Sequence, residues 1–242
     1  VFYLYERPYE KDENEEFSWL QILSCKVANL LEVSVNNIFL KIRKKQKGEN
    51  QYEKENKNSV LIKVIEQGHL LLVNISNYLD TGLFFDHRPL RKKVEESAKG
   101  KSVLNLFCYT ASFSVYAAKS GATKVTSVDL SNTYLSWAKK NFTLNGLSPE
   151  NEKFEFINGD VKSFLQRTKE KYDIIILDPP TFSNSKKTQT DLDINRDWPV
   201  FVDLCTKLLN KDGVLYFSTN SKKLRFEENL LPQGYIVKDI TE

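Results

Sequence analysis

Residues 174–182 read IIILDPPTF, a short apolar run that ends in an acid, two prolines and, after a threonine, an aromatic residue. The apolar run predicts a buried strand. Proline cannot continue a strand and restricts the residue before it, so the strand must end at Asp178. The two prolines therefore present the Asp178 carboxylate rigidly at the edge of a sheet, with Phe182 following as a face on which a flat base could stack.

The sequence on both sides of this stretch, from residue 81 onward, alternates between strand-like and helix-like patterns. We expect further strands at 103–107, 124–128, 154–157 and 214–218 and helices at 111–119, 132–145, 161–168 and 199–209. Such alternation is typical of βαβ units and predicts an α/β domain built on a parallel, Rossmann-like sheet. Residues 235–240 are predicted to add a sixth strand.

The first 80 residues follow a different pattern, which predicts a separate small α+β domain. Its expected strands cover 1–5, 38–42, 60–65 and 70–75, and an amphipathic helix covers 15–31. The predicted domains are therefore 1–80 and 81–242, with a charged connecting helix over 86–99.

Composition describes an ordinary globular protein, since 40% of the residues are hydrophobic and 12% aromatic. No apolar run approaches the roughly 20 residues of a membrane-spanning helix, and the first residues do not resemble a signal peptide. Three scattered cysteines imply no disulfide framework, which favours a cytoplasmic protein. The chain starts within a predicted strand and contains no methionine, so we expect it to be part of something longer.

The turn after the first strand of the sheet, LNLFCYTAS at 104–112, has no glycine. Loops that bind phosphate groups at this place need several glycines, so that backbone amides can approach the pyrophosphate. A nucleoside without phosphates, such as S-adenosylmethionine, therefore fits the turn better than NAD or ATP. A plain connection between strand and helix remains the alternative for this turn taken alone.

Acidic residues follow the next two strands as well. Asp129 lies twenty residues beyond Tyr109, where a nucleoside-binding acid accepts hydrogen bonds from the ribose hydroxyls. Asp160, one strand further on, could accept from the adenine amino group. Either acid could instead cap the helix that follows it. Amino methyltransferases carry Asn/Asp-Pro-Pro-Tyr/Phe where this chain has Asp178, but here Thr181 occupies the fourth position and the aromatic residue comes one later.

The segment TGLFFDHR at 81–88 precedes the larger domain. Arg88 could pair with the carboxylate at the methionine end of the cofactor. Alternatively, Phe84 and Phe85 only join the two domains. The two histidines, His69 and His87, build no metal site with these cysteines, and no triad of nucleophile, histidine and acid is visible.

A basic segment in the small domain is a candidate for binding RNA phosphates; its residues are Lys41, Arg43, Lys44, Lys45 and Lys47. Such runs are usually solvated surface, and the net charge of +3 is too small to decide. Further basic residues in 183–187 and 222–225 lie near the presumed active edge. Together they suggest a polyanionic substrate.

Several long motifs give the chain a resemblance to a known family. They are KIRKKQKGENQY at 41–52, YLDTGLFFDHR at 78–88, LNLFCYT at 104–110, VDLSNTYLSWA at 128–138, LNGL at 144–147 and DPPTFSNSK at 178–186. The chain resembles the C-terminal half of the bacterial bifunctional 23S ribosomal RNA guanine methyltransferases of the RlmKL type. The resemblance covers essentially the whole chain and implies a class I methyltransferase fold, S-adenosylmethionine as cofactor and 23S ribosomal RNA as partner.

The resemblance also implies roles for individual residues. The cofactor would be bound by the following positions: Arg88, Asn105, Phe107, Cys108, Tyr109, Thr110, Asp129, Leu130, Ser131, Asp160, Val161 and Asp178. Asp178 and Phe182 would place the target base. The family's C-terminal half is implied to methylate guanine N7, and an N-terminal half that methylates guanine N2 would be absent from this chain.

Three alternatives remain. A related family methylates cytosine C5 in 23S ribosomal RNA, but it carries FSCS in the fifth strand where this chain has FSTN at 217–220. A nicotinamide-dependent dehydrogenase would need a glycine-rich first turn. A non-catalytic RNA-binding module would not need the acids at the strand ends.

Overall fold

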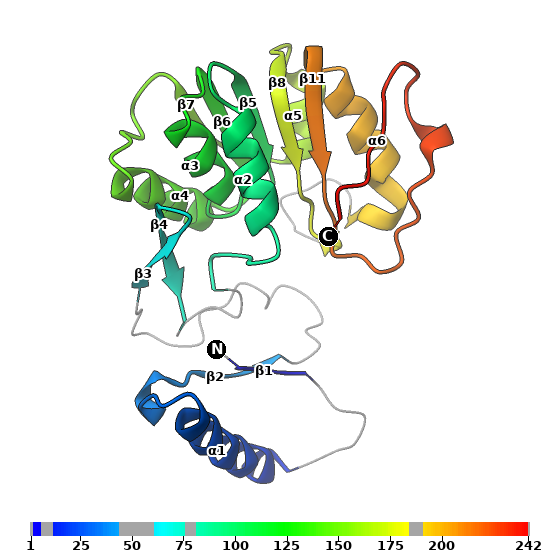
Figure 1. Ribbon diagram of the computed structural model, residues 1–242. Coiled ribbons are helices and arrows are strands. Elements are labelled where there is room, and N and C mark those ends of the chain that lie inside the picture. Colours follow the sequence, from blue (N-terminus) through cyan, green and yellow to red (C-terminus); the bar gives the residue numbers. More distant parts are fainter. Residues whose placement is uncertain (1, 6–11, 44–60, 76–80, 184–190, 242) are drawn as a thin grey trace. The chain divides into compact units, whose positions relative to one another are not determined.

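The computed structural model describes residues 2–5, 12–43, 61–75, 81–183 and 191–241 (Figure 1). The chain divides into two compact units. Unit 1 comprises Val1–Ile62 and Val73–Thr81, and unit 2 comprises Lys63–Leu72 and Gly82–Glu242. The acidic strand ends lie in unit 2, and the basic segment lies in unit 1.

Unit 1 contains β1 (Phe2–Tyr5), α1 (Glu13–Leu30), a short 3₁₀ helix (Val35–Asn37) and β2 (Leu40–Arg43). β1 and β2 pair in parallel, as expected when a helix connects two strands. The Asp12 carboxylate caps α1 by accepting from the amide of Asn14. The predicted helix over 15–31 is thus confirmed to within two residues.

A hairpin links the two units. Its strands are β3 (Leu61–Glu66) and β4 (His69–Asn74), and residues 63–72 at its tip belong to unit 2. Gln67 and Gly68 form the turn with φ of 50° and 88°. Two successive left-handed residues match the twist of a tight hairpin, and glycine adopts this conformation without strain.

Five parallel strands form the sheet of unit 2: β5 (Ser102–Leu106), β6 (Lys124–Asp129), β7 (Phe154–Asn158), β8 (Tyr172–Leu177) and β11 (Leu209–Phe217). Their order is β11-β8-β5-β6-β7, so the predicted parallel sheet is confirmed. The chain runs outward from β5 in both directions. Ligands of such sheets bind beyond the carboxyl ends of the strands at this reversal, between β5 and β8.

Alternate side chains of the strands face opposite sides of the sheet. Leu104 and Leu106 belong to an apolar core with α5 (Val161–Arg167) and α6 (Ile194–Thr206). On the other side, the amide of Asn105 donates to Ser114 Oγ of α3 (Ser112–Lys119). α3 also contacts α2 (Arg88–Ser97) and α4 (Asn132–Leu144), which lie on the same side of the sheet in Figure 1. Helices therefore cover both faces, as in doubly wound folds.

The structure differs from two of our expectations. The helix predicted from Pro199 begins at Ile194, because Asp193 caps it and Pro199 is accommodated inside the helix. The strand predicted over 235–240 is wrong, since these residues form no strand. Ile236 is 99% exposed, so the apolar pattern there is not buried against the described sheet.

A short antiparallel pair, β9 (Phe182–Ser183) and β10 (Leu192–Asp193), follows the Asp-Pro-Pro turn. A 3₁₀ helix (Glu228–Leu230) lies near the end of the chain. No helix in the described part of the chain has the length and apolar character needed to cross a bilayer.

Candidate cofactor and substrate site

The turn after β5 has a strained backbone. Phe107, Tyr109 and Ala111 have φ of 53°, 52° and 59°, which are left-handed values in residues other than glycine. Each such residue costs on the order of 1–3 kcal/mol and persists only where the surroundings hold it in place. Strain of this kind concentrates at ligand sites, which agrees with the prediction that this turn contacts the cofactor.

Two hydrogen bonds between Thr110 and other segments hold the strained turn. The hydroxyl of Thr110 donates to the carbonyl of Gly82 at 2.7 Å. The side-chain amide of Asn141 on α4 donates to the carbonyl of Thr110 at 2.9 Å. Thr110 and Asn141 are both buried, so these bonds are protected from competition with water. Gly82 therefore helps to hold the turn, while the alternative that Phe84 and Phe85 join two domains stays a prediction.

Asp129 joins the ends of β5 and β6. Its Oδ2 accepts from the amide of Tyr109 at 2.9 Å, and its Oδ1 accepts from the amide of Ser131 at 2.8 Å. Burial raises the pKa of this carboxyl group to about 6, although the backbone amides that donate to it act in the opposite direction. An ionised carboxylate has about four lone-pair sites, so capacity remains for a further donor such as a ribose hydroxyl.

The end of β7 holds the backbone beside this carboxylate through a residue that the sequence analysis missed. The amide of Asn158 donates to the carbonyls of Leu130, at 2.9 Å, and Asp129, at 3.2 Å. Asn158 immediately precedes the Gly-Asp pair that ends in Asp160. Asp160 itself caps α5, because its Oδ2 accepts from the amide of Ser163 at 2.8 Å. Its contact with adenine stays a prediction beside this observed cap.

Aromatic rings surround the side chain of Tyr109. Its ring centroid lies 5.5 Å from Phe84, 4.5 Å from Tyr134 and 6.4 Å from Trp137. Tyr134 and Trp137 are three residues apart on α4 and so lie on one face of the helix. That spacing is the signal by which the sequence could have identified them.

The side chains of other predicted cofactor residues are buried or packed against other parts of unit 2. Asn105 is 2% exposed and bonded to Ser114, and Val161 is 2% exposed in the apolar core. The ring of Phe107 packs against that of Phe201 on α6, with centroids 5.9 Å apart. Cys108 is buried, and the desolvation of its thiol raises its pKa well above the usual value.

Asp178 lies at the end of β8, as predicted, and two side chains contact one of its oxygens. The hydroxyl of Ser218 donates to Oδ1 at 2.5 Å, and Nε2 of His87 lies 3.5 Å from the same oxygen. Burial raises the pKa of the carboxyl group, while His87 and the bond from Ser218 act in the opposite direction. Phe182 follows and is 53% exposed. The sequence analysis did not associate His87 with this acid.

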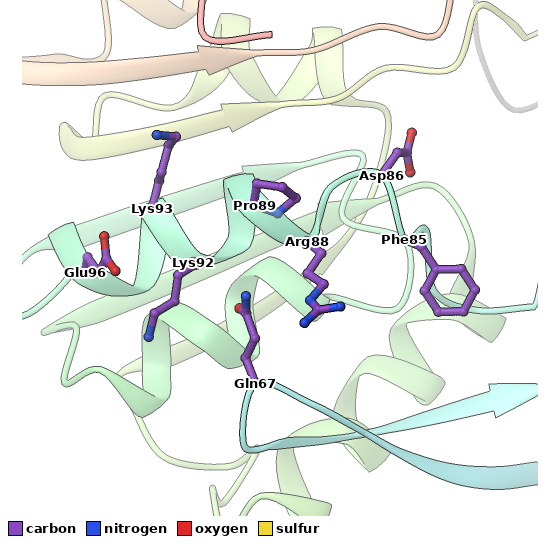
Figure 2. Close-up of a pocket in the computed structure, with 8 residues that line it drawn as sticks. All are labelled: Gln67, Phe85, Asp86, Arg88, Pro89, Lys92, Lys93 and Glu96. Carbon is purple, nitrogen blue, oxygen red and sulfur yellow. The ribbon is translucent and has the colours of Figure 1, made fainter. Parts of the chain in front are cut away.

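Arg88 has a different environment from the acids. It is exposed at the start of α2 and lines an open pocket with Gln67, Phe85, Asp86, Pro89, Lys92, Lys93 and Glu96 (Figure 2). In this view the Arg88 side chain extends to the side where Gln67 lies, whereas Asp86 points away from it. The pairing of Arg88 with a cofactor carboxylate stays a prediction.

The predicted RNA-binding residues are described only in part. Lys41 and Arg43 lie in β2 of unit 1. Lys44, Lys45 and Lys47 lie outside the described residues. Their contact with RNA stays a prediction.

The residues present at the carboxyl edge fit a phosphate-free nucleoside. Asp129 has acceptor capacity left for a ribose hydroxyl, the strained turn lies at the strand reversal, and no glycine-rich phosphate loop is present in 103–120. Comparison with known proteins agrees with this chemistry. Residues 37–222 match the S-adenosylmethionine-dependent methyltransferase family. The chain belongs to this family, and its cofactor is S-adenosylmethionine.

Two individual relatives are similar to this chain over most of its length. The chain is 47% identical over 215 residues to the ribosomal RNA large subunit methyltransferase K/L of Pseudomonas syringae, covering 89% of this chain and 28% of the relative. It is 43% identical over 237 residues to the protein of the same name in Pseudomonas putida, covering 98% and 32%. The resemblance inferred from the motifs is confirmed, and the chain spans about a third or less of these relatives.

Solved structures show the same fold. The crystal structure of SMU.776 complexed with SAH has a TM-score of 0.65 and 31% identity, and the match covers 84% of this chain and 53% of that one. A SAM-dependent methyltransferase from Agrobacterium tumefaciens has a TM-score of 0.63 and 27% identity, over 70% and 55% of the two chains. The expected Rossmann-like methyltransferase fold is confirmed.

Proposed function

We propose that this chain methylates N7 of guanine in 23S ribosomal RNA, with S-adenosylmethionine as the donor. The relatives named ribosomal RNA large subunit methyltransferase K/L support ribosomal RNA as the substrate class. The observation that carries the choice of site is Asp178, held at the end of β8 beside the strand reversal, with the exposed Phe182 following it. Unit 1, with its basic segment, would contact RNA phosphates, and a guanine-N2 methyltransferase half would lie outside this chain.

The bound cofactor supplies an electrophilic methyl group on a sulfonium sulfur. Guanine N7 has a lone pair and carries no proton, so the transfer needs no general base. Asp178 can accept a hydrogen bond from the N1–H or the N2–H donor of guanine, and Phe182 can stack on the base. Methylation gives the base a positive charge, which an ionised carboxylate stabilises.

Positioning would then supply most of the rate enhancement. Holding donor and acceptor in line contributes up to about 7–11 kcal/mol when the geometry is good. Asp129 would hold the ribose of the cofactor, and the turn at 107–111 would fix the cofactor relative to Asp178. The strain of that turn and the hydrogen bonds that maintain it are consistent with such preorganisation.

The alternative of cytosine C5 methylation requires a thiolate that adds to the base. Cys108 is the cysteine at the strand reversal, but burial and the nearby Asp129 raise its pKa and so favour the neutral thiol. Cys205 is buried on α6, and Cys25 lies on α1 of unit 1. The segment after β11 contains Ser218 and Thr219 where a cysteine would be needed. These features favour guanine N7.

Mass spectrometry of nucleosides tests the proposal. 23S ribosomal RNA lacking the modification is incubated with the protein and methyl-labelled S-adenosylmethionine, then digested. We expect labelled 7-methylguanosine, and Asp178→Asn as a matched variant should lose most of it. Labelled 5-methylcytidine or N2-methylguanosine in its place would overturn the assignment.

A further inference from the structure

The contacts of Asp178 have a consequence beyond the proposed reaction. Three segments meet at its carboxylate: the Asp-Pro-Pro turn after β8, the segment before α2 that carries His87, and the residues after β11 that carry Ser218. Both partners contact Oδ1. Because both contacts from the described residues are made to Oδ1, Oδ2 is the oxygen that can accept a hydrogen bond from the substrate.

We propose that His87 and Ser218 are positioning residues that hold Oδ1 of Asp178, so that Oδ2 is directed at the base to be methylated. This inference rests on the proposed role of Asp178 as the acid that contacts the substrate. His87 is the more informative partner, because a protonated imidazole adds a positive charge beside the carboxylate as well as a hydrogen-bond donor.

The arrangement differs from a nucleophilic triad, although it contains the same three residue types. In such a triad the histidine lies between the acid and the serine and takes the proton of the serine. Here the acid lies in the middle, and His87 and Ser218 each contact it. The serine hydroxyl donates to the carboxylate instead of to a histidine, which fits a positioning role for Ser218 rather than nucleophilic attack.

The surroundings of Asp178 give the electrostatic reason for a histidine at this position. Burial disfavours the charged carboxylate, and Asp86 adds like charge. His87, Ser218 and Arg91 act in the opposite direction. His87 also packs near Phe113, with ring centroids 5.7 Å apart, which fixes the ring from the α3 side. Removal of the imidazole should therefore leave the carboxyl group harder to ionise and less well oriented.

The first test is kinetic. His87→Leu removes the imidazole, whereas His87→Gln keeps an uncharged polar amide near the position of Nε2. We expect His87→Leu to lower kcat for methyl incorporation into RNA about tenfold or more, because misplacement near 1 Å can cost about a hundredfold. The KM for S-adenosylmethionine should stay within about twofold, and His87→Gln should recover part of kcat.

A double-mutant cycle separates support of Asp178 from general damage. In the Asp178→Asn background, His87→Leu should have little further effect, because the group it supports is already gone. His69→Gln is the matched control: it changes the other histidine of the chain, which pairs with Glu95 at 2.7 Å on the hairpin side of unit 2. Circular dichroism confirms that each variant is folded, and the control should retain wild-type kcat and pH profile.

The second test does not depend on activity. Carbon-13 NMR of labelled aspartate carboxyls follows the Asp178 signal, assigned by its loss in Asp178→Asn. The pKa of Asp178 should rise in His87→Leu and also in Ser218→Ala, because each lost contact favours the ionised form. The acid limb of the kcat profile should move to higher pH in parallel.

The two proposals fail in different ways. A wild-type chain that methylates no guanine in RNA overturns the proposed function, while the carboxyl titration still tests the support by His87 and Ser218. An active wild-type chain overturns the present inference if His87→Leu retains kcat, if its effect is additive with Asp178→Asn, or if the Asp178 titration does not move.

Discussion

Replacing Gly82 by alanine should disturb both the strained turn after β5 and its contact with α4. Gly82 has φ of +99°, and an added Cβ would lie 2.4 Å from Cζ2 and 2.6 Å from Cη2 of Trp137. Real Cβ atoms do not approach other atoms so closely, and an indole ring has no flexible end that could move aside. The carbonyl of Gly82 also accepts the hydrogen bond from Thr110. Glycine is therefore required at position 82 for two reasons: the backbone has a positive φ, and there is no space for a side chain.

The expected cost is the sum of two terms. A left-handed backbone costs a residue other than glycine roughly 1–2 kcal/mol. Overpacking against a rigid neighbour adds about 1–3 kcal/mol. Gly82→Ala should thus reduce the free energy of unfolding by about 2–5 kcal/mol, a large part of the roughly 5–15 kcal/mol of an ordinary domain.

Gly68→Ala provides the matched control. Gly68 has φ of +88°, close to that of Gly82, but its added Cβ would meet nothing within 4 Å. It should show the backbone cost of roughly 1–2 kcal/mol without the overpacking. The difference between the two variants therefore isolates the contact with Trp137.

Urea unfolding followed by tryptophan fluorescence measures both variants, and calorimetry measures their affinity for S-adenosylmethionine. Gly82→Ala should also weaken cofactor binding, because the hydrogen bond to Thr110 shapes the turn, whereas Gly68→Ala should not. Equal destabilisation by the two substitutions would refute the close approach to Trp137. An unchanged affinity in Gly82→Ala would refute the link between this glycine and the turn.

Four further predictions follow from the same structure. Calorimetry should show that cofactor affinity falls as the pH drops through about 6, because Asp129 accepts hydrogen bonds from ribose best when it is ionised. Asp129→Ala should reduce the binding free energy by about 1.5–3 kcal/mol per lost bond and remove this pH dependence. Arg91→Ala should lower the free energy of unfolding measured in urea by about 3–5 kcal/mol, because the carboxylate of Glu66, 2.7 Å away, stays buried without its charged partner. A loss below about 1 kcal/mol would contradict this. Alanine at three basic residues of segment 41–47 (Arg43, Lys44, Lys45) should reduce the salt dependence of RNA binding by up to about three phosphate equivalents, and an unchanged slope would show a solvated surface. Serine at all three cysteines should leave appreciable methylation in the labelled-methyl assay, whereas a folded but inactive variant would favour covalent catalysis.

The fold class could be predicted because its signals are local. Parallel strands buried under helices on both faces give apolar runs, and the polar or acidic residue that ends each run marks the edge of the sheet. Asp129 and Asp178 were located in this way, and the structure places both at strand ends. The proline pair fixes the end of β8 whatever its partners are. The hydrophobic pattern misled at 235–240, where the structure has no strand.

Other contacts join residues that lie far apart in the sequence and share no recognisable pattern. Asn145, the residue that ends α4, binds Leu70 of the hairpin, 75 residues earlier: its Oδ1 accepts from the backbone amide of Leu70, and its Nδ2 donates to the carbonyl. The hydroxyl of Tyr116 bonds to the carbonyl of Glu66, 50 residues earlier. Neither contact has a spacing that a single sequence could reveal. They explain why residues 63–72 belong to unit 2.

The sequence by itself therefore determined the parallel sheet, its acidic strand ends, the glycine-free turn after the first strand of the sheet and, through its long motifs, the relationship to methyltransferases. Those properties depend on hydrophobic period, on proline and glycine, and on residue type, all of which can be recognised within a few residues. Only the tertiary structure decided that His87 and Ser218 contact Asp178, that Gly82 holds Thr110, and which side chains at the strand ends are buried. Such contacts arise when distant segments pack together, and a local pattern carries no information about which segments will meet.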